Sequence, residues 1–230
     1  MTRQALRRQH RIDAILASAI SVFRRHGYHG TSMDQIAEQL LMTKGSLYYY
    51  FRDKEEILFA AHDRALDRIL EELERVRRGP GCPCEQVEAL LAAHIRIMVE
   101  GFHGTALALE FGVLSPRRLR AVVDKRDRFE RGLRTMLEKG AAEGCLRPVD
   151  AKLAGMAMLG SINWIARWYR PDGPLGPQDV AVRFLDLFRG GLAPGKSARA
   201  HIHPAASGVR PRPARRGARR PRRTAARRTP

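Results

Sequence analysis

The sequence has little from which a disulfide framework, a membrane span or a β-sheet could be built. It has three cysteines among 230 residues, and this odd number, with no signal-peptide pattern, indicates a reducing, cytoplasmic setting. Its most apolar stretch, residues 153–166, is interrupted by Ser161 and Asn163 and is too short to span a bilayer, so we expect a soluble protein with no membrane partner. No alternating strand pattern occurs, which leaves an all-α fold as the prediction.

The sequence also lacks the motifs of common enzyme classes. It has no Gly-rich phosphate loop, no HExxH metal pair and no nucleophile elbow, so we predict no catalysis and no cofactor. His26 and His29 have no ligand partners at metal spacing. Cys82-Pro83-Cys84 has no second ligand pair nearby in the sequence, so we expect a solvent-side loop at this position and not a metal site.

The C-terminal segment 194–230 has no acidic residue and almost no large apolar side chain. It holds Lys196 and eleven arginines, so that the net charge of +18 falls to +6 for the other residues. Such a segment cannot offset the entropy of ordering, and we predict that it is disordered. A dense polycation binds phosphates without sequence preference, so we expect it to strengthen non-specific DNA binding. The alternative is a merely solvated tail.

Apolar residues elsewhere recur at the three- and four-residue spacing of helices with one buried face. Gly27 is expected to end the first helix in a left-handed conformation. Thr31 or Ser32, each followed three positions later by Asp34 or Gln35, predicts the start of the second helix. The expected helices are 11–25, 33–40, 44–51, 54–78, 84–102, 103–114, 117–140, 150–170 and 177–192.

Helices 33–40 and 44–51 are separated by only three residues, the spacing of a helix-turn-helix. Leu47 and Phe51 are four residues apart, so they share a face and are expected to pack inward. The other side chains of this helix would then face the open side: Lys44, Gly45, Ser46, Tyr49 and Tyr50, with Tyr48 at the edge. A glycine costs a helix about 1 kcal/mol, which close approach of DNA would explain. The alternative is that all three tyrosines fill a small core.

Residues 8–58 resemble the DNA-binding domain of the TetR family of transcriptional regulators, above all in TSMDQIA (31–37) and MTKGSLYYYFRDKE (42–55). The resemblance implies a homodimeric regulator, most often a repressor, that binds a double-stranded DNA operator and responds to a small effector. It implies DNA contacts at Thr31, Thr43, Lys44, Gly45, Ser46, Tyr48, Tyr49, Tyr50 and Lys54. Tyr50 stands where the family often has His. The implied domains are a DNA-binding domain (1–54), a helical effector-binding and dimerisation domain (55–193) and the basic tail.

The resemblance further implies that the dimer forms through helices 150–170 and 177–192. Their apolar and small residues are compatible with close helix packing: Leu153, Met156, Ala157, Leu159, Gly160, Val180, Phe184, Leu185, Leu187 and Phe188. The alternative is that these faces bury only against their own subunit.

The middle helices are then expected to enclose an effector pocket. Its candidate residues are His94, Met98, Phe102, Phe111, Met158, Trp164 and Trp168, and ordinary core packing is the alternative for each. Segment 160–173 resembles a C-terminal signature of TetR-type regulators of fatty-acid and steroid catabolism, which implies an acyl-CoA-like effector. Arg126, Arg128 or Arg170 would then bind its phosphates, although helical ion pairs of Arg126 with Glu130 and of Asp124 with Arg128 would explain two of them.

A second class of function stays open at this point. A nucleoid-associated, architectural protein would bind DNA mainly through its polycationic tail, with an incidental helix-turn-helix. A short palindromic footprint is expected only for the regulator.

Overall fold

The computed structural model describes residues 2–99, 111–170 and 172–192, and all regular secondary structure in these ranges is helical. The expected all-α fold is therefore confirmed. Phe102, most of the expected helix 103–114 and the basic tail lie outside the described residues; residues 111–114 form a turn. No helix in the described ranges is long and apolar enough to cross a membrane.

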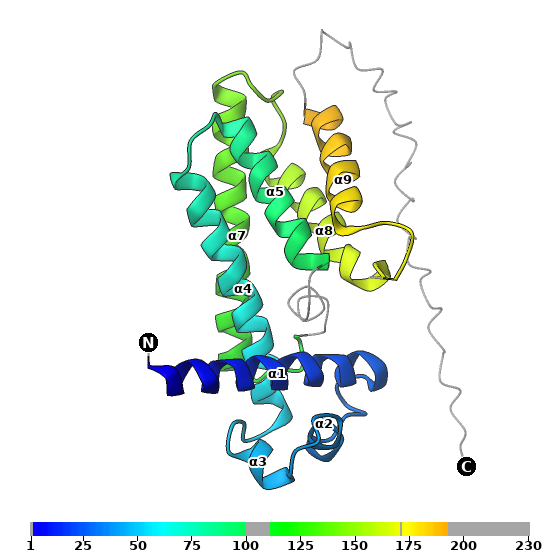
Figure 1. The fold of residues 1–230 in the computed structure, drawn as a ribbon. Coiled ribbons are helices and arrows are strands. Elements are labelled where there is room, and N and C mark those ends of the chain that lie inside the picture. Colours follow the sequence, from blue (N-terminus) through cyan, green and yellow to red (C-terminus); the bar gives the residue numbers. More distant parts are fainter. Residues whose placement is uncertain (1, 100–110, 171, 193–230) are drawn as a thin grey trace, which may run out of the picture. The chain divides into compact units, whose positions relative to one another are not determined.

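Three helices form the N-terminal head (Figure 1): α1 (Arg3–His26), α2 (Met33–Gln39) and α3 (Lys44–Tyr48). α1 begins eight residues before the expected start, capped by the hydroxyl of Thr2, which accepts from the Ala5 N–H at 3.3 Å. Its first two turns are exposed and so lack the apolar face by which periodicity identifies a helix. The chain then turns at Gly27, which has the expected positive φ of 70° but an extended ψ of 164°.

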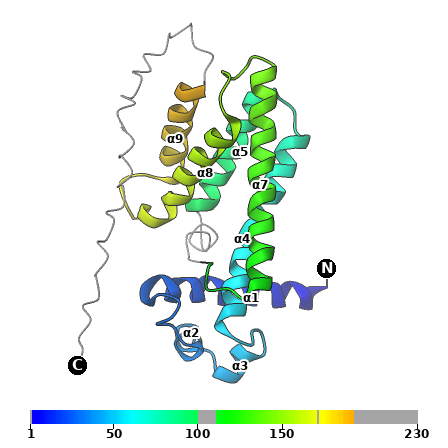
Figure 2. The same ribbon diagram turned by 180° about the vertical axis from the view of Figure 1, so that it is seen from behind.

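Five longer helices form the body: α4 (Lys54–Arg78), α5 (Pro83–Val99), α7 (Pro116–Ala142), α8 (Ala151–Trp168) and α9 (Pro177–Leu192). α4 packs against α1 at its N-terminal part and against α5 and α7 further along, so it joins the head to the body. Seen from behind, α4 and α7 run side by side (Figure 2). Gly132 of α7 permits this approach, because a Cβ there would lie 2.4 Å from Cδ2 of Leu73.

Candidate DNA-binding surface and effector cavity

Local caps hold the helix-turn-helix. The hydroxyl of Ser32 accepts from the Gln35 N–H at 3.2 Å, and the Gln35 side chain accepts from the Ser32 N–H at 2.8 Å, the reciprocal box that starts α2. Thr43 caps α3 with a single bond, its hydroxyl accepting from the Ser46 N–H at 3.2 Å. These bonds fix where each helix begins and thus how α3 is presented.

α3 is anchored from one side. Leu47 is fully buried and Phe51 is 6% exposed, which confirms the expected inward face. The helix ends at Tyr48, earlier than expected, but the N–H groups of Tyr50 and Phe51 still donate to the Leu47 carbonyl at 3.0 and 3.1 Å. The helical path therefore continues as a turn that brings Phe51 into the core.

The three tyrosines are divided between core and solvent. Tyr49 is 75% exposed and Tyr48 is 44% exposed, so the alternative in which all three fill a small core is wrong. Tyr50 is half-buried against the core, and its ring meets that of Tyr49 edge-on at a centroid distance of 5.0 Å. Tyr50 therefore supports Tyr49 from behind and faces the open side less than expected.

Polar groups gather on the exposed side of α3. Lys44 forms an exposed ion pair with Asp34 at 2.8 Å, and this hydrogen-bonded carboxylate raises the pKa of Lys44. The Thr43 and Ser46 hydroxyls lie 2.8 Å apart. A Cβ on the exposed Gly45 would meet no atom within 4 Å, so nothing inside the protein requires a glycine there. A close approach from outside would.

Two of the expected DNA-contacting residues are engaged within the protein. Thr31 is only 3% exposed, and its hydroxyl donates to the Gly27 carbonyl at 2.8 Å. The Lys54 ammonium donates to the carbonyls of Tyr28 and Thr31 at 2.9 and 2.8 Å, and it stands 4.7 Å from the centre of the Tyr28 ring. In this structure the Thr31 hydroxyl closes the α1–α2 turn, and Lys54 holds that turn against the start of α4.

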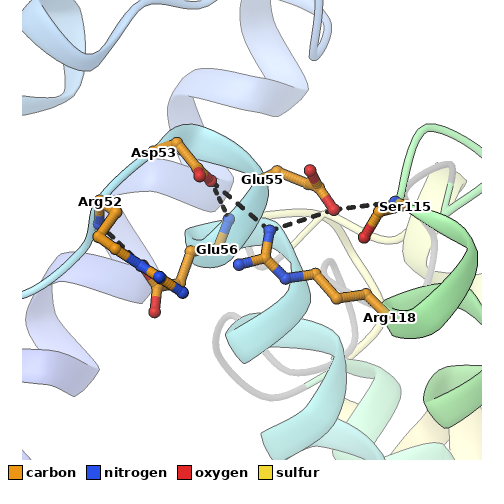
Figure 3. A network of polar contacts seen from close by, with 6 residues as sticks. All are labelled: Arg52, Asp53, Glu55, Glu56, Ser115 and Arg118. Atoms are coloured by element: carbon orange, nitrogen blue, oxygen red, sulfur yellow. Dashed lines mark hydrogen bonds and ion pairs between the residues drawn. The ribbon is translucent and has the colours of Figure 1, made fainter.

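A polar network joins the start of α4 to α7 (Figure 3). Glu55 accepts from the Ser115 N–H at 2.8 Å and from Arg118 at 3.1 Å, while Arg118 also lies 3.6 Å from the Asp53 carboxylate. The Ser115 N–H is the main cause of the lowered pKa of Glu55. Further along, Lys125 of α7 lies 2.5 Å from Asp63 and 2.6 Å from Asp67 of α4. The sequence pattern missed these contacts, because the partners are about sixty residues apart.

A cavity of about 350 Å³ lies among α4, α5, α7 and α8. Its apolar lining includes Leu66, Phe129 and Leu159, and its polar lining consists of His94, Arg126, Asp127, Glu130 and Asn163. This volume lies at the lower end of the range for small-molecule sites.

The cavity contains polar groups that the protein does not satisfy. His94 is 3% exposed, and neither ring nitrogen has a hydrogen-bond partner in the described part of the chain. Burial, aided by the charge of Arg126 and opposed by the nearby Asn163 amide, lowers the pKa of His94 to about 4. The ring is therefore neutral near pH 7. His62, fully buried beside the cavity and edge-on to Phe111, also has a pKa lowered by burial to about 4.

Arg126 has no carboxylate partner among the described residues. Its guanidinium instead stands 4.5 Å over the Phe111 ring, and burial lowers its pKa. The expected ion pair with Glu130 is wrong, because Glu130 faces Arg134 at 3.8 Å and its buried Oε1 has no hydrogen-bond partner. An unpaired, half-buried guanidinium suits an anionic or carbonyl-bearing ligand. Of the other candidates for phosphate binding, Arg128 and Arg170 are exposed.

The remaining effector candidates separate into core and surface. Met98 and Met158 are buried in the core, and Phe111 does not line the cavity but packs under the Arg126 guanidinium. Trp164 and Trp168 do not line this cavity. They are 60% and 42% exposed, because α8 turns a different stripe inward, namely Gly155, Met158, Ile162, Ile165 and Ala166.

The exposed face of α8 carries an apolar stripe, which continues onto α9. We call it the α8–α9 stripe; its residues are Leu153, Met156, Ala157, Gly160, Trp164, Trp168 and Leu187. The Trp168 ring stacks on Phe184 with an interplanar angle of 17°. Leu153 and Leu187 are 64% and 70% exposed, so the alternative of burial within the same subunit does not hold for them. It does hold for Val180, which is 1% exposed.

Three cysteines meet at one place. The sulfur atoms of Cys82, Cys84 and Cys145 lie within 4.8 Å of one another. The sequence reasoning considered the first two alone, because nothing in the spacing links them to a cysteine sixty residues later.

Comparisons with known proteins cover both parts of the chain. Residues 15–61 match the model of bacterial regulatory proteins of the tetR family, and residues 80–192 match that of the tetracyclin repressor-like C-terminal domain. The HTH-type transcriptional repressor KstR2 of Mycobacterium tuberculosis is 28% identical over 191 residues, covering 77% of this chain and 90% of KstR2.

Two solved structures are also similar. The TetR family transcriptional regulator PfmR from Thermus thermophilus is 34% identical, with a TM-score of 0.69, covering 76% of this chain and 96% of PfmR. AibR in complex with isovaleryl coenzyme A and operator DNA is 28% identical, with a TM-score of 0.69, covering 80% of this chain and 98% of AibR.

Proposed function

The chain belongs to the TetR family of bacterial regulatory proteins, and we propose that it is a repressor that binds a palindromic operator as a homodimer. A small amphipathic effector, of the acyl-CoA type, releases it from the DNA. Its site of action is then the cytoplasm, where the operator lies. The observation that carries the proposal is the division of α3, with Leu47 buried and Tyr49 three-quarters exposed.

The proposed DNA contacts follow from this division. Phenol hydroxyls and hydroxyl side chains donate to phosphate oxygens, and a lysine reaches a phosphate or a guanine edge. Lys44 reaches DNA by exchanging its exposed pair with Asp34 for a phosphate. The contacting set is Thr43, Lys44, Gly45, Ser46, Tyr48 and Tyr49. Tyr50, Thr31 and Lys54 position this set from within.

The α8–α9 stripe supports the proposed homodimer. One helix-turn-helix reads few base pairs, and pairing two heads raises the affinity for a palindrome without any new base contact. An exposed apolar stripe with alanine and glycine at its centre suits the close packing of two helix pairs.

The cavity supports an effector of the acyl-CoA class. Its apolar walls suit a short acyl chain, and Arg126 suits a carbonyl or phosphate oxygen. AibR, a relative of this chain, was crystallised with isovaleryl coenzyme A and operator DNA.

The contacts of α7 support a route from cavity to DNA. Arg126 and Arg118 are eight residues apart on α7, about 12 Å along its axis. Arg118 pairs with Asp53 and Glu55 at the start of α4, and Asp53 follows the α3 turn by two residues. An effector that draws Arg126 into the cavity would shift α7 and, through Arg118, the base of the head.

The test begins with selection of bound fragments from genomic DNA, followed by footprinting and a screen of acyl-CoAs of increasing chain length for release of the best fragment. We expect a short palindromic footprint. Tyr49→Ala and Lys44→Ala should abolish it with an unchanged helical spectrum, while Lys139→Ala, an exposed lysine of α7, should not. Continuous protection without a palindrome would favour the architectural alternative instead.

The basic tail is proposed to add only non-specific affinity. Deleting residues 197–230 should weaken binding to unrelated DNA and flatten its dependence on salt, because fewer counterions are released. Operator preference should be unchanged. Equal salt slopes with and without the tail would contradict this role.

A further inference from the structure

The three-cysteine cluster lies where two loops of the body meet, the loop before α5 and the loop between α7 and α8. Cys82 precedes α5, Cys84 lies in its first turn, and Cys145 lies in the loop between α7 and α8. All three are free thiols; Cys82 is exposed and the others are half-buried. An ion from solution can therefore reach sulfur atoms that already lie within 4.8 Å of one another.

The first connection is held by its own hydrogen bonds. Gly81 takes a φ of 110°, which places the Cys82 N–H 2.9 Å from the Glu85 carboxylate. The Gln86 N–H donates to the Cys82 carbonyl at 3.0 Å. Cys82 and Cys84 are thus set on the rigid start of α5.

The second connection is held against two helices. The Leu146 N–H donates to the Gly140 carbonyl of α7 at 3.0 Å, and the Arg147 N–H donates to the Leu192 carbonyl of α9 at 2.9 Å. Gly140 makes room for this loop, because a Cβ there would lie 2.6 Å from Cδ1 of Leu146 and 3.5 Å from the sulfur of Cys145. Cys145 is therefore presented by a fixed backbone.

The thiols already interact with one another. Cys84 stands between the other two, and its hydrogen bond with Cys82, together with burial and the bond with Cys145, raises the pKa of Cys84 to about 12. The same contact lowers the pKa of Cys82. The three sulfur atoms therefore lie close together before any ion binds.

We propose that Cys82, Cys84 and Cys145 form a binding site for one soft, filled-shell metal ion, Zn(II) or Cu(I). Thiolates select such ions over hard cations. With metal–sulfur bonds of about 2.3 Å, the bound sulfurs lie roughly 3.7–4 Å apart, so closure moves each by no more than about 1 Å. Binding exchanges three S–H protons for three metal–sulfur bonds and transfers no electron.

The donor count limits the geometry. No fourth His, Cys, Asp or Glu of the described ranges joins the group. Zn(II) would complete its tetrahedron with a solvent molecule, as in three-ligand sites. Cu(I) would be three-coordinate, bound by the three sulfurs alone. In either case the ion ties the start of α5 to the end of α7, the two helices that carry His94 and Arg126.

The test uses the full-length, untagged protein, reduced and handled without oxygen. One portion is titrated with Co(II), whose visible bands report tetrahedral sulfur coordination, and then with Zn(II). Another is titrated with Cu(I) against a competing chelator. We expect one ion per chain, and a melting temperature higher by roughly 5–10 °C at about 100 times the dissociation constant. Whichever ion binds more tightly identifies the metal.

Variants locate the site. Cys145→Ser should weaken binding by more than about 100-fold, beyond the usual effect of an outer-shell change. Glu85→Gln weakens only an outer-shell support of Cys82 and should lower the affinity by no more than about 10- to 100-fold. Equal affinity of Cys145→Ser and the unaltered chain would overturn the proposal.

A second measurement does not depend on folding of the variants. The metal-loaded, unaltered protein is alkylated and its modified cysteines are counted by mass spectrometry. Protection of all three cysteines supports the site. Protection of two or fewer, formation of a disulfide in place of metal uptake, or no uptake by a chain with three titratable thiols refutes it.

Discussion

The head and the body differ in how far their polar groups find hydrogen-bond partners within the protein. In the head, caps and the Lys54 contacts satisfy the helix ends within the domain. In the body, the ring nitrogens of His62 and His94 and the Oε1 atom of Glu130 are buried without a hydrogen-bond partner in the described chain. A buried, unsatisfied polar group costs about 1–3 kcal/mol. The head therefore leaves one buried hydroxyl, that of Ser18, without a partner, whereas the body retains two imidazoles and a carboxylate oxygen that a partner could satisfy.

The same contrast appears in the apolar surface. The head exposes tyrosines, which suit a wet, charged partner such as DNA, while the body exposes the α8–α9 stripe, which suits another protein surface. Changes in the body should then alter responses to partners, and changes behind the reading surface of the head should alter its stability.

The largest effect is expected from a charge on the α8–α9 stripe. Leu153→Asp should dissociate the proposed dimer and lower operator affinity by about 100-fold or more, because two linked heads gain that much over one. Sedimentation and operator titration measure both effects. Lys152→Ala, its exposed neighbour on α8, should change neither. A dimer that persists in Leu153→Asp would move the interface elsewhere.

The next effect tests the cavity. Arg126→Met should leave operator binding intact but raise the effector concentration needed for release by about 10- to 100-fold, the value of one or two hydrogen bonds to a charged group. Release curves measure this shift. Arg128→Met, two residues further along on the exposed face, is the matched control. If both variants respond equally, the effector does not use this cavity.

How far the sequence predicted each region follows from the same contrast. In the head, the capping partners are three residues apart, as in Ser32 with Gln35 and Thr43 with Ser46, so local spacing indicated them. The exposed early turns of α1 were missed, because only an apolar face produces a periodic signal.

In the body, the deciding contacts span about sixty residues, as between Glu55 and Ser115 or Cys84 and Cys145. No spacing rule connects such partners. Trp164 and Trp168 illustrate the limit: helical spacing placed both on a stripe of α8 but could not tell which side of the helix the rest of the body would cover. The pairing of Arg126 with Glu130 failed for the same reason, since Phe111 and Arg134 competed for these groups.

A third prediction concerns the buried imidazoles. The pKa of His62 is about 4 in the folded chain, against about 6.5 when unfolded. Between pH 6.5 and about 4, His62 is protonated in the unfolded chain but not in the folded chain. The free energy of unfolding therefore falls as the pH drops towards 4.

The variant His62→Leu removes this contribution. Its unfolding free energy should fall less steeply between pH 6.5 and 4, by up to about 1.4 kcal/mol per pH unit. Denaturant titrations at several pH values give the slope, and carboxylates that titrate in the same window contribute equally to both proteins. His10→Gln, an exposed histidine of α1, should keep the original slope. Parallel curves for His62→Leu would mean that the ring titrates normally.

A smaller effect is expected behind the reading surface. Lys54→Met removes the donor to the carbonyls of Tyr28 and Thr31, and should lower the free energy of unfolding by about 1 kcal/mol. Operator affinity at low temperature, where the head stays folded, should change little. A large loss of affinity with unchanged stability would return Lys54 to the role of a phosphate contact.

The smallest effect is expected at Leu41, in the turn between α2 and α3. Leu41 has a φ of 51° and is 97% exposed, and a side chain in this left-handed region costs about 1–2 kcal/mol. Glycine would relieve that strain but lose about 0.5–1 kcal/mol to the entropy of the unfolded chain, so Leu41→Gly should raise stability by at most about 1.5 kcal/mol. The head buries none of this exposed leucine, and a contact of its side chain with DNA, beyond the contacting set above, would account for the strain; operator affinity should then fall in the variant. Unchanged operator affinity in the variant would mean that Leu41 does not contact DNA.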